Sequence, residues 1–177
     1  MQTDLRTGEY SGILPLYYVF LARTGHKLLN LETIGIDSTG NHYVSMEEKF
    51  AGVRIKMTQD GINEKELTYM KFDLGNTSLD ANPQYMNWVN SLGEKNVFIK
   101  AASYLLHYKS FEQVRKTIFS NTGSIFQDDS GLAYRYVDST QFNTTLFGDY
   151  TRPIDDFGDQ TFQKDLEKLY LSTPKEN

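Results

Sequence analysis

Strict alternation of hydrophobic and polar residues marks the clearest strand in the chain. In residues 53–58, Val53, Ile55 and Met57 alternate with polar side chains, which predicts one dry face and one wet face. Similar patterns predict strands at residues 28–36, 42–45 and 67–74. Turn-forming residues separate these segments, at 37–41 and 60–61. Strands in close succession with short turns predict an antiparallel meander.

Apolar residues follow a helical period in other segments. A stripe with the spacing i, i+3, i+4 and i+7 predicts a helix that Asn82 and Pro83 open. Its members are Tyr85, Trp88, Val89 and Leu92. Residues 13–22 form the longest apolar run and predict a largely buried helix that ends at Gly25. A strand is the alternative for this run, because Tyr, Val and Phe favour strands.

The second half of the chain alternates short strands with helices. Strands are predicted at residues 96–100, 124–127 and 132–136. Ser110 and Gln113 have the spacing of a capping box, in which the serine hydroxyl accepts the N–H of Gln113, so a helix is predicted over 110–121. Residues 101–108 are helix-prone, and a final helix is predicted over 162–170.

These elements together predict an α+β fold. We expect a mostly antiparallel sheet of about five to seven strands with about four helices packed against it. The chain has 177 residues, a length typical of one domain, and its 12 Tyr and 11 Phe supply the volume of a core. No linker rich in Pro, Gly or Ser interrupts the sequence. We therefore expect residues 1–177 to form a single soluble globular domain.

Charge and residue usage exclude several functions. A net charge of −5 without a Lys/Arg cluster argues against nucleic acid as a partner. The absence of cysteine excludes disulfides, a thiol nucleophile and a cysteine-based zinc site. No apolar run reaches the ~20 residues of a membrane span. The local motifs of nucleotide binding and of serine hydrolases are also absent from the sequence.

The adjacent carboxylates Asp128 and Asp129 are the strongest candidate for a site. They follow a predicted strand and precede the flexible Gly131, and carboxylate oxygens are the ligands that a divalent cation such as Ca²⁺ or Mg²⁺ prefers. One of the two could instead act as a general base. The competing interpretation, favoured by the residue types, is a β-turn in which the aspartate side chains bond the backbone.

Ser103 and His107 form a second candidate. On a helix over 101–108 they stand at i and i+4, so the hydroxyl and the imidazole would lie on one face. A helical serine usually bonds a carbonyl one turn back, which favours a histidine at the core edge over a nucleophile pair. A bolder hypothesis places the strand before His107 beside the strand before Asp128, so that His107 meets Asp128 or Asp129.

Three segments of the chain resemble a known family. They are residues 100–107 (KAASYLLH), 127–131 (QDDSG) and 147–150 (FGDY). They are similar to the C-terminal portion of a family of uncharacterised bacterial proteins that are usually longer and usually exported, and the similarity runs from Gly12 to near the C-terminus. The resemblance implies a bacterial origin, an extracytoplasmic location in the periplasm or at the cell surface, and a missing N-terminal half. No activity is attached to the family, so it transfers no catalytic residues.

The expected function is a non-catalytic binding or structural domain of a bacterial envelope-associated protein, with a protein or glycan partner. The alternative is a hydrolase or divalent-cation-dependent enzyme that uses Asp128, Asp129 and His107. An enzyme should hold these carboxylates in a concave pocket. A binding module should expose an aromatic or apolar patch. Half of a larger fold should expose an apolar sheet face or an unpaired strand edge.

Overall fold

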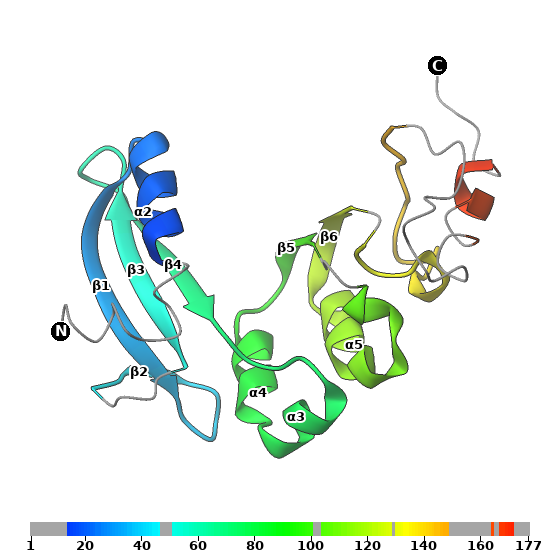
Figure 1. The fold of residues 1–177 in the computed structure, drawn as a ribbon, viewed down its shortest axis with the longest axis horizontal. Helices are drawn as coiled ribbons and strands as arrows, with labels where there is room; N and C mark the ends of the chain where they lie inside the picture. Colours follow the sequence, from blue (N-terminus) through cyan, green and yellow to red (C-terminus); the bar gives the residue numbers. More distant parts are fainter. Residues whose placement is uncertain are drawn as a thin grey trace. The chain divides into compact units, whose positions relative to one another are not determined.

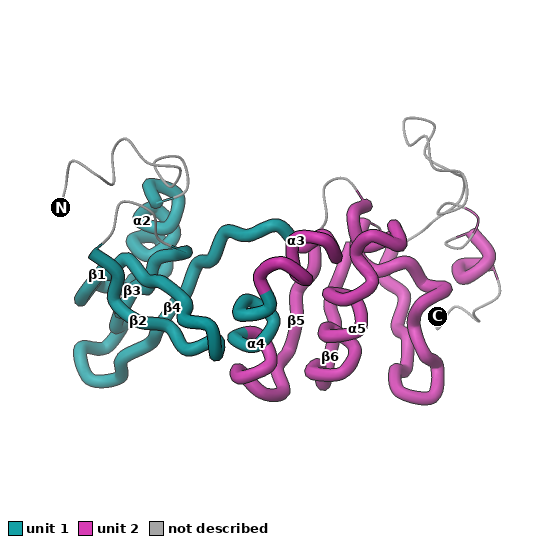
Figure 2. Tube along the Cα trace, turned by 90° about the horizontal axis from the view of Figure 1, so that it is seen from below, with its two compact units in different colours: residues 1–73, 83–88 teal, residues 74–82, 89–177 magenta. Residues whose placement is uncertain are grey.

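The chain divides into two compact units. A computed structural model describes residues 14–46, 51–100, 104–128, 130–148, 164 and 167–171. Unit 1 comprises Met1–Asp73 and Pro83–Trp88, and unit 2 comprises Leu74–Asn82 and Val89–Asn177 (Figure 2). The single domain expected over residues 1–177 stays a prediction. No helix within the described ranges is long and apolar enough to cross a membrane.

The described part of unit 1 contains an antiparallel sheet with a helix against it (Figure 1). Its elements are α2 (Leu14–Arg23), β1 (Lys27–Ile36), β2 (His42–Val44), β3 (Gly52–Thr58) and β4 (Glu64–Met70). The strand order is β2-β1-β3-β4. The antiparallel pairing is as predicted, but the meander order is wrong, because β3 pairs with β1 and not with β2. The short strand β2 pairs with the end of β1 at one edge. At the opposite edge, β3 pairs with most of the length of β1.

The apolar face of this sheet packs against α2. Leu14 of the helix and Val53 of β3 are buried together, and Tyr17, Leu31 and Tyr69 pack around them. The Tyr17 and Tyr69 rings meet edge to face, with 5.8 Å between their centres. Burial, followed by the neighbouring Tyr69, raises the pKa of the Tyr17 hydroxyl. The dry face predicted for β3 is confirmed by the full burial of Val53.

The predicted helix over 13–22 is confirmed as α2, but the expectation that it is largely buried is wrong. Leu14 and Leu21 are buried, whereas Leu16, Val19 and Phe20 are 55%, 54% and 63% exposed. The exposed three stand at i, i+3 and i+4, on the helix face opposite Leu14 and Leu21. Because α2 has apolar residues on both faces, the described sheet covers only the face that carries Leu14 and Leu21.

Gly25 ends α2 as predicted. Its φ of +72° is a left-handed conformation that glycine adopts without strain. The Gly25 N–H donates to Ala22 O over 3.2 Å, and the His26 N–H donates to Leu21 O over 2.8 Å. This pair of hydrogen bonds is a Schellman motif, which satisfies carbonyls that the end of the helix would otherwise leave open.

Unit 2 contains a small parallel sheet among short helices. Its described elements are α3 (Asn76–Ala81), β5 (Lys95–Ile99), the 3₁₀ turns η1 (Leu105–His107), η2 (Lys109–Phe111) and η3 (Tyr134–Tyr136), α5 (Glu112–Ser120) and β6 (Thr122–Gln127). Helix α4 (Gln84–Ser91) belongs in part to each unit. The predicted α+β class is therefore confirmed, with the described strands distributed over two sheets in place of one.

Strands β5 and β6 lie side by side and run parallel (Figure 1). Val97 is opposite Ile125, and Ile99 is opposite Gln127. Parallel neighbours need a long connection, which here includes α5. The hypothesis that the strand before His107 lies beside the strand before Asp128 is confirmed.

The predicted capping box at Ser110 is wrong, although the helix that follows is confirmed as α5. The helix begins at Glu112, and no side chain of its N-cap residue bonds the helix. The N–H of Gln113 instead donates to Asn76 Oδ1 over 3.1 Å. The amide group of Asn76 also donates to Lys109 O over 3.1 Å. A side chain from α3 thus caps α5, which local spacing cannot reveal.

Two further element predictions are wrong. The predicted strand over 132–136 is the 3₁₀ turn η3. The helix-prone segment 101–108 contains Tyr104 in a left-handed conformation, with a φ of +54°, followed by the turn η1. A left-handed residue interrupts an α-helix, so residues 104–108 do not form one. The pairing of Ser103 with His107 stays a prediction, because Ser103 lies outside the described residues.

Candidate functional site

Asp128 shapes the loop that follows β6. Its Oδ1 accepts the Ser130 N–H over 3.0 Å and the Ser130 hydroxyl over 2.6 Å. The Gly131 N–H donates to Asp128 O over 3.2 Å, which closes a β-turn. The turn interpretation of this aspartate is therefore confirmed. Lys100 Nζ lies 3.9 Å from Asp128 Oδ2, and 70% of the lysine side chain is exposed.

Gln127 closes the same loop from inside. Its side-chain Oε1 accepts the Leu132 N–H over 2.7 Å, and its Nε2 donates to Leu132 O over 2.9 Å. The Gln127 amide thus bonds both main-chain groups of Leu132, as the backbone of a neighbouring strand would. Gly131 packs closely against the Gln127 side chain, and a larger residue would overlap it, since a Cβ at position 131 would lie 2.5 Å from Gln127 Oε1. The QDDSG sequence therefore has a structural reason for its glutamine, first aspartate, serine and glycine.

The other predicted site residues divide between described and undescribed positions. Ser103 and Asp129 lie outside the described residues. His107 is buried in η1, and its ring meets Tyr104 edge to face, with 5.6 Å between centres. A meeting of His107 with Asp128 or Asp129 stays a prediction, because the contacts described for His107 and Asp128 are with other residues.

A buried arginine lies beside His107, and sequence reasoning missed it. Arg115 of α5 is 5% exposed. Its guanidinium donates to Leu106 O over 3.0 Å and to Tyr108 O, and it lies 4.1 Å from the centre of the Tyr136 ring. Arg135 covers the same ring at 4.8 Å. The position of Arg115 on the apolar side of α5 was the only available sign of burial in the sequence.

A groove of about 670 Å³ runs along β6 in unit 2. One wall is formed by every residue from Gly123 to Asp128, and another by residues 141–147. Figure 1 draws that second segment in yellow to orange, outside β6. Its aromatic lining consists of Phe126, Tyr134, Phe142, Phe147 and Tyr170. Its uncharged polar lining includes Ser124, Gln127, Gln141, Asn143, Thr144 and Thr145.

Three phenylalanine rings form a row at the groove. Phe98 and Phe126 are paired across β5 and β6 and stack with 5.6 Å between ring centres. Phe147 lies 6.2 Å from Phe126. The three residues are 68%, 58% and 71% exposed, respectively. We call Phe98, Phe126 and Phe147 the aromatic row.

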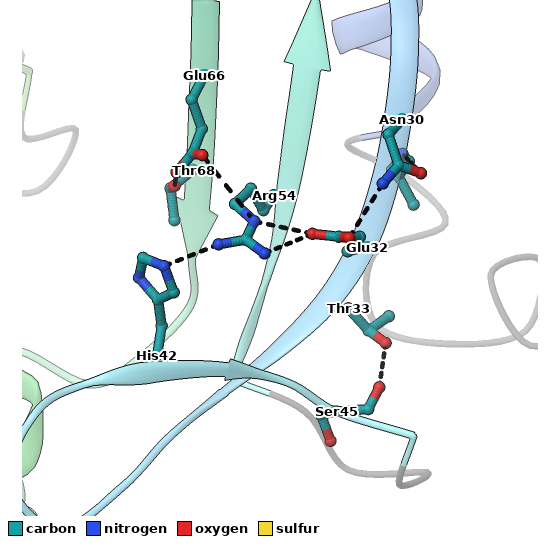
Figure 3. Close-up of polar contacts among 9 residues, drawn as sticks. Asn30, Glu32, Thr33, His42, Ser45, Arg54, Glu66 and Thr68 are labelled. Atoms are coloured by element: carbon teal, nitrogen blue, oxygen red, sulfur yellow. Dashed lines mark hydrogen bonds and ion pairs between the residues drawn. The ribbon is translucent and has the colours of Figure 1, made fainter.

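A polar network covers the opposite, wet face of the sheet in unit 1, and it was also not predicted (Figure 3). Arg54 donates through Nε to Glu32 Oε2 over 2.9 Å and shares a hydrogen bond of 2.8 Å with His42 Nε2. Glu66 approaches the same guanidinium at 4.0 Å. The hydrogen bond from Arg54 is the main cause that lowers the pKa of Glu32. One guanidinium contacts two carboxylates and an imidazole in this network, and these side chains are mutually satisfied, which makes the network a polar sheet face more than a site.

Within the described ranges, no group of three or more His, Asp or Glu side chains is arranged to hold a metal ion.

Comparison with protein families, curated proteins and solved structures finds no match to this chain. The resemblance carried by residues 100–107, 127–131 and 147–150 therefore stays a prediction. The groove along β6 is the candidate site that the described residues define best.

Proposed function

We propose that this chain is a non-catalytic binding domain whose ligand occupies the groove along β6. The observation that carries the proposal is the aromatic row, which leaves three large rings exposed beside a groove of about 670 Å³. Exposed apolar patches of this kind mark binding sites more often than chance surface. A volume of that size lies in the range of ligand sites, which is about 300–1,000 Å³.

The polar lining supports binding in preference to catalysis. Gln141, Asn143, Thr144 and Thr145 offer neutral donors and acceptors, which orient a ligand without activating it. Asp128 also lines the groove, and its Oδ1 already accepts two hydrogen bonds from Ser130. A carboxylate oxygen held in this way supports a turn more readily than it accepts a proton from a substrate.

The enzyme alternative keeps one observation in its favour, which is the presence of Asp128 in the groove wall. A hydrolase or divalent-cation-dependent enzyme would use the remaining oxygen, together with Asp129 and His107. The bacterial envelope setting, in the periplasm or at the cell surface, belongs to the same proposal and rests on the family resemblance alone.

Probing immobilised ligands with the full chain tests the proposal. The probes are an array of oligosaccharides and an array of random dodecamer peptides, each read with the wild type and with an F126A/F147A double variant. The matched control is F20A, which removes an exposed ring from α2 in unit 1. We expect hits that F20A retains and that F126A/F147A loses, with circular dichroism confirming that both variants fold.

Three outcomes would contradict the proposal. The first is the absence of any hit, and the second is hits that survive loss of Phe126 and Phe147. The third is chemical conversion of a probe that D128N abolishes, which would favour the enzyme.

A further inference from the structure

We infer that the ligand of this groove is an extended peptide segment, carrying a lysine or arginine, that adds as a third strand to the outer edge of β6. The inference rests on the proposed function and names the chemistry of its ligand. Its basis is that one wall of the groove is a strand edge, which offers main-chain hydrogen bonds that only another extended backbone matches in period and spacing.

The edge itself is the first argument. β5 and β6 form a sheet of two strands, so among the described residues β6 pairs only along the side that faces β5. All positions from Gly123 to Asp128 line the groove, a length of about 20 Å at the usual rise of a strand. Alternate N–H and C=O groups along this length point away from β5. A two-stranded sheet is marginal by itself, and a third strand would extend it.

The aromatic row supplies the second argument. Side chains of an added strand alternate between the two faces of the sheet. Those on the face that carries Phe98 and Phe126 would lie next to Phe126 and Phe147. The opposite wall, residues 141–147, carries amide and hydroxyl side chains that can bond the far edge of the same peptide. A groove with a backbone edge on one side and neutral polar groups on the other fits a peptide better than a sugar, which has no repeat that matches the ladder.

Charge gives the third argument and the residue type of the ligand. Of the described residues that line the groove, Asp128 alone is charged, and it directly follows β6. Its ion pair with Lys100 is long, at 3.9 Å, and exposed, so it contributes little. A lysine or arginine side chain of the ligand could form an ion pair with the Asp128 carboxylate. A second copy of the chain is a poorer occupant, because two copies with a net charge of −5 each repel one another.

The test begins with dodecamer peptides selected from a random library against the wild-type chain. Each selected peptide is then synthesised as a series in which one backbone nitrogen at a time is methylated. Methylation removes one donor and leaves the protein unaltered, so misfolding of a variant cannot imitate the result. We expect binding to fall about tenfold or more at every second position, where the N–H faces β6, and to fall less between them, where the N–H faces the side chains of residues 141–147.

The charge argument is tested with D128N, which keeps an acceptor for Ser130. We expect this variant to bind the selected peptides several-fold more weakly and with less dependence on salt. The matched control is E64Q, which removes a carboxylate from β4 in unit 1. E64Q should leave binding unchanged.

The outcomes separate the inference from the proposed function. Peptides that bind without the two-residue period, or oligosaccharides that bind through Phe126 and Phe147 while peptides do not, overturn the inference and leave the binding domain intact. A concentration-dependent dimer in sedimentation that peptides cannot displace also overturns the inference, with a second copy as the occupant. Failure of every probe overturns both.

Discussion

The guanidinium of Arg115 lies 4.1 Å from the centre of the Tyr136 ring and is almost fully buried. Its charge is stabilised by two main-chain carbonyls of the segment 106–108 and by the ring face. The arginine therefore connects α5 to two turns that carry no regular hydrogen-bond ladder of their own. Loss of this one side chain should loosen a large part of unit 2.

Replacing Arg115 by methionine should lower the free energy of unfolding by roughly 2–4 kcal/mol, because Leu106 O loses its guanidinium donor, Tyr108 O keeps only the Phe111 N–H, and the cation–π contact is removed. Urea denaturation followed by circular dichroism measures the change. The control is Lys116→Met, at the next position, where 73% of the side chain is exposed and only an ion pair with Glu112 is lost. Equal effects of the two substitutions would contradict the structural role of Arg115.

Asn76→Ala should destabilise the protein by about 1–2 kcal/mol, the usual cost of a lost helix cap. The substitution removes the acceptor of the Gln113 N–H and the donor to Lys109 O. Ser110→Ala serves as the control and should cost less than about 0.5 kcal/mol, because the capping box is not formed. Thermal unfolding of both variants decides between the cap that the sequence predicts and the cap that the structure has.

Gly131→Ala should destabilise the loop after β6, by about 1–3 kcal/mol, because the new methyl group would overlap Gln127 Oε1. Adding Gln127→Ala removes the overlap with Oε1 and leaves that with the Cβ of residue 127, so the double variant should be less destabilised than the sum of the two single variants. A double-mutant cycle from denaturation curves measures this coupling. Simple additivity would argue against a close approach of the two residues.

Stability should fall in acid partly through Glu32. The hydrogen bond from Arg54 lowers the pKa of Glu32 in the folded state, so folding favours the charged carboxylate. Its contribution is complete above the unfolded pKa of about 4.3 and is lost as the pH falls through the lower folded value. Denaturation at pH 7 and pH 3 should therefore show a smaller loss of stability for Glu32→Gln than for the wild type. Glu64→Gln, away from Arg54 on β4, should follow the wild type.

The sequence pattern correctly predicted the features of the fold that depend only on residues close together in the sequence. The alternation at Val53 and Ile55, the turn at residues 37–41 and the left-handed Gly25 all depend on neighbours within a few positions. In that turn, Asp37 Oδ1 accepts the N–H groups of Thr39 and Asn41. The β5–β6 neighbourhood was also predicted, from the order of elements.

The rest depends on partners far away in the sequence. Asn76 lies 37 residues before the N–H that it caps, and no spacing rule connects the two. Strand order depends on which strands pair with the two edges of β1, and burial of α2 depends on how many surfaces surround it. At the candidate site, the sequence pattern located Asp128. The groove also needs residues 141–147 to lie across from β6, and an irregular segment has no pattern that predicts its position.

The Asn76 cap has a consequence for how the protein can be produced. Asn76-Thr77-Ser78 matches the acceptor sequence for N-linked glycosylation. A glycan attached in a eukaryotic secretory host would occupy the Nδ2 atom that donates to Lys109 O. Secreted material from yeast or mammalian cells would then carry a sugar on the side chain whose Oδ1 caps α5, whereas bacterial cytoplasmic expression leaves the amide unmodified.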